Sequence, residues 1–176
     1  YISHHFNSAF SGLDRTTVLD RADQADRTAY KFKRQLFKAT QKGTSTSEIM
    51  AQVAAQRLRC PLLDDNEECV LYDHRPITCR LYGIPTAIGG QSHTCGKSAF
   101  EQGKEYPTVN IDVIQDKLML LSKSLADSLN TKHAQLAEML VPLSMALLTE
   151  YNDEYLGVKK PKEDTGMWTL GEDGSV

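Results

Sequence analysis

The sequence lacks several features that would place it in a class at once. No apolar run approaches the roughly 18 residues needed to span a membrane, and no apolar segment at its start resembles a secretory signal. The net charge of −3 and the pI near 6.0 argue against a general nucleic-acid binder. Together with a mean hydropathy of −0.41, these absences predict a cytoplasmic protein with one domain.

Recognisable catalytic motifs are absent as well. No P-loop, no serine–histidine–aspartate set and no paired-carboxylate signature stands out, and no glycine-rich strand–turn–helix fingerprint suggests a nucleotide-type cofactor. The adjacent acidic pairs Asp64–Asp65 and Glu67–Glu68 are better explained as a solvated turn. The sequence therefore leaves open whether the protein is an enzyme, and it indicates no substrate.

Reactive side chains are concentrated in one segment, residues 59–96. All four cysteines of the chain lie there, separated by 8, 9 and 15 residues: Cys60, Cys69, Cys79 and Cys95. Disulfide frameworks belong to short secreted chains without a sufficient core, whereas this chain has 176 residues and 40% hydrophobic content. Two disulfides and four unrelated buried thiols remain alternatives. The favoured interpretation is that the four thiols converge on one metal or iron–sulfur centre.

The nature of that centre stays open between zinc and a [4Fe–4S] cluster, since both accept four cysteine ligands. Structural zinc sites usually bring C-x2-4-C knuckles, and this sequence has none. Cysteine followed by proline, here Cys60–Pro61, is a feature of ferredoxin ligation and favours iron–sulfur slightly. Either His74 or His93 could replace one thiol, although a surface position is the more common one for histidine.

Arginines stand near three of the cysteines. Four thiolates on Zn(II) or on an oxidised cubane leave a net negative charge, which must be offset or hydrogen-bonded if it is buried. Arg75 and Arg80 are therefore candidates to donate hydrogen bonds to the thiolates. The alternative is that these arginines pair with the acidic run 64–68, and this alternative is favoured for Arg59.

The segment C-P-L-L-D-D-x3-C-x-L-Y-x-x-R-P-x-x-C-R-L-Y-G, residues 60–83, resembles the second half of the YkgJ-type cysteine-cluster family of zinc- or iron-chelating proteins. The resemblance implies that Cys60, Cys69, Cys79 and Cys95 belong to the family's metal-binding set. The family pattern opens with a C-x-x-C-x-x-C-C cluster, and no cysteine precedes Cys60 here. Either the upstream cluster was lost in this protein, or the sequence lacks its own N-terminus. We expect the second, because residues 1–7 read like the inside of a helix.

Three functions follow from this resemblance and the cysteine pattern. The first is a metal-binding protein with a redox or metal-handling role. The second is an enzyme related to the flagellin lysine methylase branch of the family, which is disfavoured because no methyl-donor fingerprint is visible. The third is a helical interaction module, with a possible protein partner, in which the zinc is purely structural.

Hydrophobic periodicity predicts a mostly α-helical, irregular domain built around the cysteine-ligated centre. The expected helices are 14–42, with an apolar stripe that includes Val18 and Ala22, 45–58, which opens with a capping box, 75–82, 110–129 and 132–151. In the last of these, Pro142 is expected to start a fresh segment or to kink the helix. Gly89–Gly90 is typical of a small hairpin that returns the chain to Cys95. The two long helices, 14–42 and 110–129, are expected to share one core. Residues 1–11 are short and mixed, although residues 1–7 read like the inside of a helix, and His4 and His5 are treated as surface residues.

The predicted domain covers residues 1–156. Residues 157–176 are rich in glycine and charged side chains and predict a flexible polar tail that adds little to the fold. The exceptions are Met167, Trp168 and Leu170, which could dock on the body of the protein.

Overall fold

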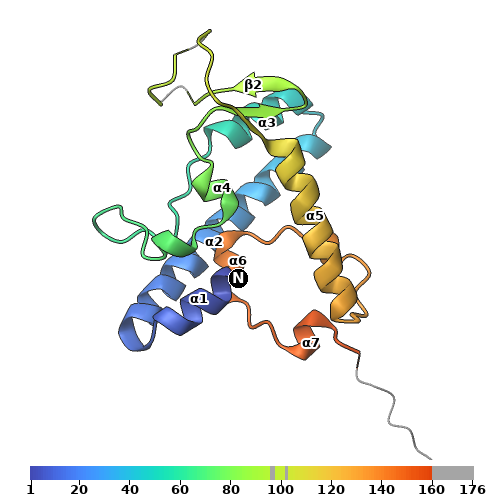
Figure 1. Ribbon diagram of the computed structural model, residues 1–176. Helices are drawn as coiled ribbons and strands as arrows, with labels where there is room; N and C mark the ends of the chain where they lie inside the picture. Colours follow the sequence, from blue (N-terminus) through green and yellow to red (C-terminus); the bar gives the residue numbers. More distant parts are fainter. Residues whose placement is uncertain (96–97, 102, 160–176) are drawn as a thin grey trace, which may run out of the picture.

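The structure is a computed structural model, and it describes residues 1–95, 98–101 and 103–159. Within these residues the chain is mostly α-helical with one small sheet, as predicted (Figure 1). The α-helices are α1 Ile2–Ala9, α2 Gly12–Gln41, α3 Thr46–Ala55, α4 Ile77–Arg80, α5 Ile111–Ser128, α6 Leu143–Leu148 and α7 Asp153–Leu156. The 3-10 helices are η1 Tyr72–His74 and η2 Leu136–Glu138, and the strands are β1 Thr86–Ile88, β2 Gln91–His93 and β3 Val109–Asn110.

The long helix α2 and the shorter α3 are joined as the sequence predicts. Gly43, just after α2, has φ +86°, a conformation that glycine adopts without steric cost. The capping box is present: the Ser45 hydroxyl accepts a hydrogen bond from Glu48 N at 3.3 Å, and Ser45 N donates to the Glu48 carboxylate at 3.1 Å. This box fixes the start of α3. The helix ends at Ala55, three residues before the predicted end at residue 58.

The hydrophobic core lies where α1 and α6 pack on the N-terminal half of α2. Its members are all less than 5% exposed: Phe6, Val18, Ala22, Leu62, Leu71 and Leu147. The helix α1, which includes most of the stretch expected to lie inside a helix, supplies Phe6, which is completely buried. Leu62 and Leu71 come from the cysteine-rich segment, so the same core holds the two ends of the Cys60–Cys69 loop.

The expectation that α2 and α5 share one core is wrong. No α5 residue belongs to the core cluster, and Leu118, Leu121 and Leu125 are 42%, 66% and 60% exposed. Instead α5 packs against η2 and β1, and Figure 1 shows it standing apart from the α1–α2 pair. The helix that packs against α2 is α6, and the buried residues of the α2 stripe, Val18 and Ala22, lie in the core that α6 shares with α1. The stripe of α5 has no such partner layer among the described residues.

The small sheet has the order β2-β1-β3. β1 and β2 form the predicted hairpin, with Thr86 opposite His93 and Ile88 opposite Gln91. Its turn residues Gly89 and Gly90 both have positive φ angles, as a tight two-residue hairpin turn requires. β3 pairs with β1 in parallel and leads directly into α5. The sheet therefore links the segment before Cys95 to α5.

The C-terminal part is less regular than predicted. Only η2 and α6 form within the predicted helix 132–151, and Pro142 stands as the N-cap of α6. Residues 157–159 are hydrogen-bonded to the turn after α5, with Lys132 N donating to Gly157 O at 2.8 Å. The rest of the predicted tail, residues 160–176, lies outside the described residues. No helix in the described part of the chain combines the length and the apolar character that a bilayer span needs.

Candidate metal centre

The loop that joins Cys60 to Cys69 is a compact turn built around Asp64. The Asp64 carboxylate accepts hydrogen bonds from Asn66 N and Glu68 N, both at 2.9 Å. Such side-chain caps of backbone amides stabilise tight turns. Leu63 then forms an isolated β-bridge with Cys69. The turn thus folds the chain back so that both cysteines are partly buried against the same core.

Two arginines fasten this turn. Arg21 of α2 donates to Leu63 O at 3.0 Å and to the Asp65 carboxylate at 2.9 Å. Arg59 pairs with Glu67 and also donates to the Asp64 carbonyl. The prediction that Arg59 pairs with the acidic run is therefore confirmed. The acidic run 64–68 acts as part of a folded turn, and α2 positions that turn.

Cys79 lies on α4 and is exposed. The helix starts after Pro76, whose carbonyl accepts from Cys79 N at 3.0 Å. Arg75 stacks on the Tyr72 ring with its guanidinium carbon 3.7 Å from the ring centroid. Arg80 donates to the backbone carbonyls of Arg75 and Asp73. Both arginines stiffen the approach to α4, and their predicted hydrogen bonds to cysteine thiolates stay a prediction.

Cys95 follows the hairpin and is half-buried, and its carbonyl accepts hydrogen bonds from Ser98 N at 2.9 Å and Ser98 Oγ at 2.6 Å. It lines a mostly apolar cavity of about 360 Å³ that is walled by α4, the hairpin and α5. His93 lines the same cavity, beside Ile77, Ile114 and Leu118. Cys79 therefore lies on α4, the short helix that forms one wall of the cavity lined by Cys95.

The imidazole of His74 is engaged away from the thiols. Its ring stacks on that of His5 in α1, with centroids 3.7 Å apart and planes 8° from parallel. The Tyr1 hydroxyl lies 3.4 Å from His74 Nδ1. His4 is exposed as expected, whereas His5 is partly buried in this stack. Sequence reasoning missed this contact because it joins residues 69 positions apart and depends on where α1 packs.

The Cys60 thiol is partly buried, and its acidity depends on that burial and on neighbouring groups. Burial raises the pKa of the Cys60 thiol, and the neighbouring thiols of Cys69 and Cys79 raise it further. A backbone hydrogen bond from Leu62 and the positive charge of Arg59 act in the opposite direction. A metal ion at this place would therefore displace a proton from Cys60, because the thiolate is the ligand form.

The donor chemistry fits a thiolate-bound metal, since all four cysteines are free and none forms a disulfide. Their positions are not those of an assembled ligand set: within residues 1–95, 98–101 and 103–159, no group of three or more His, Cys, Asp or Glu side chains is arranged to hold a metal ion. The set Cys60, Cys69, Cys79 and Cys95 stays a prediction.

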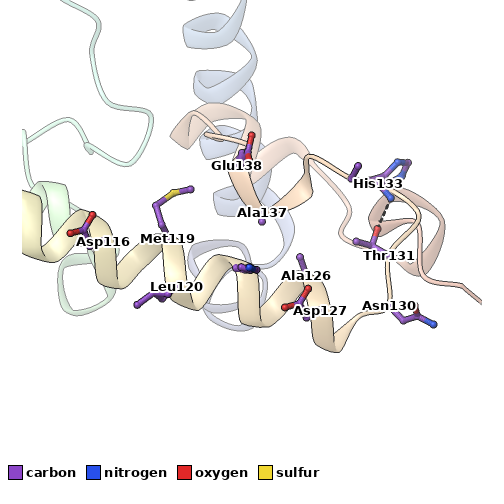
Figure 2. Close-up of a pocket in the computed structure, with 12 residues that line it drawn as sticks. Asp116, Met119, Leu120, Ala126, Asp127, Asn130, Thr131, His133, Ala137 and Glu138 are labelled. Carbon is purple, nitrogen blue, oxygen red and sulfur yellow. Dashed lines mark hydrogen bonds between the residues drawn. The ribbon is translucent and has the colours of Figure 1, made fainter.

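A larger groove of about 770 Å³ lies elsewhere, between α5 and the segment 130–138 (Figure 2). Its lining mixes acidic side chains, Asp116, Asp127 and Glu138, with apolar ones from α5. The backbone nitrogen of His133 donates to Thr131 Oγ1 at 3.1 Å at one end of the groove. No cysteine lines it, so it is separate from the candidate metal centre.

Comparison with known families agrees with the cysteine pattern. Residues 20–96 match the CxxCxxCC family, described as "Putative zinc- or iron-chelating domain". The match covers most of α2 and the whole cysteine-rich segment, so the resemblance to the YkgJ-type family is confirmed over these residues. Among curated proteins and among solved structures, no match was found.

Proposed function

We propose that this chain is a metal-binding cysteine-cluster protein that holds a [4Fe–4S] cluster or a zinc ion through Cys60, Cys69, Cys79 and Cys95. The observation that supports it most is that all four free cysteines lie in the segment that matches a chelating domain. Two of these thiols are already anchored on the core by the Asp64 turn. Cys95, which lines the cavity beside α4, would be the fourth ligand.

In this proposal, some residues hold the Cys60–Cys69 turn in place, and other parts of the chain move to complete the metal site. Arg21 and Arg59 hold the turn that carries Cys60 and Cys69. The exposed helix α4 and the segment around Cys95 are the parts that move, because four residues of helix and a short hairpin make few tertiary contacts to break. Arg75 and Arg80, freed from their backbone contacts by such a movement, would donate hydrogen bonds to the thiolates and offset their charge.

Of the two occupants, we favour the iron–sulfur cluster. The ligands come from separate loops with spacings of 8, 9 and 15 residues, and no C-x2-4-C knuckle of the structural zinc type is present. When bound, a [4Fe–4S] cluster would supply one-electron redox chemistry, and a zinc ion would supply a structural or Lewis-acid centre. If the occupant is the iron–sulfur cluster, we expect a redox or metal-handling role in the cytoplasm.

The test is the metal content of protein purified without oxygen. We expect a brown protein with about four irons and about four acid-labile sulfides per chain, as a [4Fe–4S] cluster contains. A colourless protein with one zinc would keep the chelating function and change its occupant. Protein that binds neither metal after reconstitution with iron and sulfide or with zinc would overturn the proposal.

A second candidate is an enzyme related to the methylase branch of the family. The cavity beside Cys95 and His93 favours it, because a cavity next to a metal centre can receive a substrate group. Its volume of about 360 Å³ is at the lower end of the range of about 300–1,000 Å³ for small-molecule sites. Calorimetric titration with the methyl donor S-adenosylmethionine tests this candidate, and absence of binding to the metal-loaded protein rejects it.

A further inference from the structure

A mostly apolar hollow that no cysteine lines lies between α5 on one side and α1, α6 and α7 on the other. Its volume is about 780 Å³. The charged or titratable side chains in its lining, apart from tyrosines, are His4 and Glu150. A hollow of this size and polarity resembles an unfilled part of a core more than a solvated surface.

Large apolar side chains remain uncovered around this hollow. Leu125 is 60% exposed, Met139 47%, Tyr151 38% and Val141 37%. Contiguous exposed apolar side chains on a soluble protein mark a surface that another group covers. Leu125 also belongs to the apolar stripe of α5 that the sequence predicts to be buried. The hollow is thus where the α5 stripe lacks a partner.

The C-terminal segment of the chain begins at the edge of this hollow. Leu156 lines it, and Lys159, the last described residue, is fixed three residues later by a hydrogen bond from its nitrogen to Asn130 O at 3.3 Å. Seventeen residues follow Lys159. Nine of them lead to Trp168, and nine extended residues reach about 30 Å, which is ample for a return into the adjoining hollow.

Within these seventeen residues, one stretch is apolar. Met167–Trp168–Thr169–Leu170 carries no charge and stands between Gly166 and Gly171, with acidic residues further out on both sides. An indole ring buries about 150–250 Å² of surface when it is enclosed. We propose that Met167–Leu170 docks in this hollow, with Trp168 packed against Leu125 and Met139, so that the C-terminal segment straps α5 to the rest of the domain.

The test uses the full chain and the fluorescence of Trp168, which is the single tryptophan of the sequence. In native buffer we expect its emission maximum to lie at shorter wavelength than in denaturant. We also expect its quenching by acrylamide to be reduced at least about twofold relative to the unfolded chain, because an indole buried to this extent is shielded from the quencher. Emission and quenching equal to those of the unfolded chain would overturn the proposal.

A matched pair of α5 variants locates the docking site. Leu125→Asp places a carboxylate in the hollow, where burial against the indole would be costly, so we expect Trp168 to regain solvent-like emission and quenching. Leu120→Asp is the control, because Leu120 is similarly exposed at 69% on the same helix but does not line this hollow. Equal effects of both variants would contradict the assigned place.

A replacement variant and a concentration series ensure that each outcome either supports or contradicts the proposed docking. If Leu125→Asp loses helical circular dichroism, Met139→Asp replaces it, since Met139 lies outside the α-helices on the other wall of the hollow. The emission of the wild-type chain is also recorded over a hundredfold range of concentrations. An unchanged spectrum supports docking within one chain. A shift toward the solvent-like spectrum on dilution would show that a second copy covers the indole, and this would overturn the intramolecular strap.

Discussion

Arg21 is the residue through which α2 holds the cysteine turn, and replacing it tests that anchor. The change Arg21→Met keeps most of the apolar stem of the side chain and removes its two hydrogen bonds. The bond to the Asp65 carboxylate contributes little, at most about 1 kcal/mol, because that carboxylate is 95% exposed. The bond to Leu63 O is partly buried, the arginine side chain being 28% exposed, and a charged donor in such a bond contributes about 1.5–3 kcal/mol.

Water can reach the Leu63 carbonyl after the substitution, so the lower part of that range applies. We expect Arg21→Met to lower the free energy of unfolding by about 2 kcal/mol. The assay is urea unfolding followed by far-ultraviolet circular dichroism, with a chelator present so that metal binding does not contribute. The substitution should also weaken metal binding, because the turn that presents Cys60 and Cys69 loses its attachment to α2.

Arg27→Met is the matched control on the same helix. Arg27 pairs with Asp23 at 2.7 Å, but the two side chains are 73% and 50% exposed, and such an i,i+4 pair contributes only about 0.3–0.5 kcal/mol. We therefore expect a clear difference between the two variants. Equal stability losses, or an Arg21→Met protein as stable as the wild type, would refute the idea that α2 anchors the turn through Arg21.

Two further predictions concern the ends of the described chain. Gly157 has φ +65°, and a Cβ there would overlap the His133 ring. Gly157→Ala should therefore lower the free energy of unfolding by about 1–2 kcal/mol in urea titrations. A variant as stable as the wild type would show that this contact is loose. Burial and the charge of His74 lower the pKa of His5 below 6.5, so the unfolded chain binds more protons below that pH and stability should fall as the pH drops through about 6.5. Thermal melts between about pH 8 and about pH 5 measure this loss of stability. His5→Gln should make the loss smaller, and the control His93→Gln should not. An unchanged dependence on pH in His5→Gln would contradict the assignment of the effect to His5.

The elements that the sequence predicts well are those with local signals. The Ser45–Glu48 capping box, the glycine pair of the hairpin and the stripe around Val18 and Ala22 each depend on residues a few positions apart, and all three are present. Helix α4 also forms close to its predicted place, although Pro76 is its N-cap and not its first helical residue. Local chemistry of this kind does not depend on how distant segments pack.

The features that the sequence did not predict depend on distant contacts. The packing of α1 could not be predicted, because the helix is held by the burial of Phe6 in the core beside α6. The amphipathic stripe of α5 is genuine, but periodicity shows only that a face is apolar and not what covers it. The same limit applies to the cysteines, because spacing along the chain indicates a shared centre without giving the positions of the four sulfur atoms.

The central claim is that four particular cysteines bind one metal centre, and the most direct test is metal content across single substitutions. Each of Cys60→Ser, Cys69→Ser, Cys79→Ser and Cys95→Ser should lower the metal bound per chain and the thermal midpoint together, because metal binding contributes to folding free energy. His93→Ala, beside Cys95, should leave both unchanged. Full metal content in any of the four serine variants, or a loss in His93→Ala equal to that in Cys95→Ser, would contradict the four-cysteine centre.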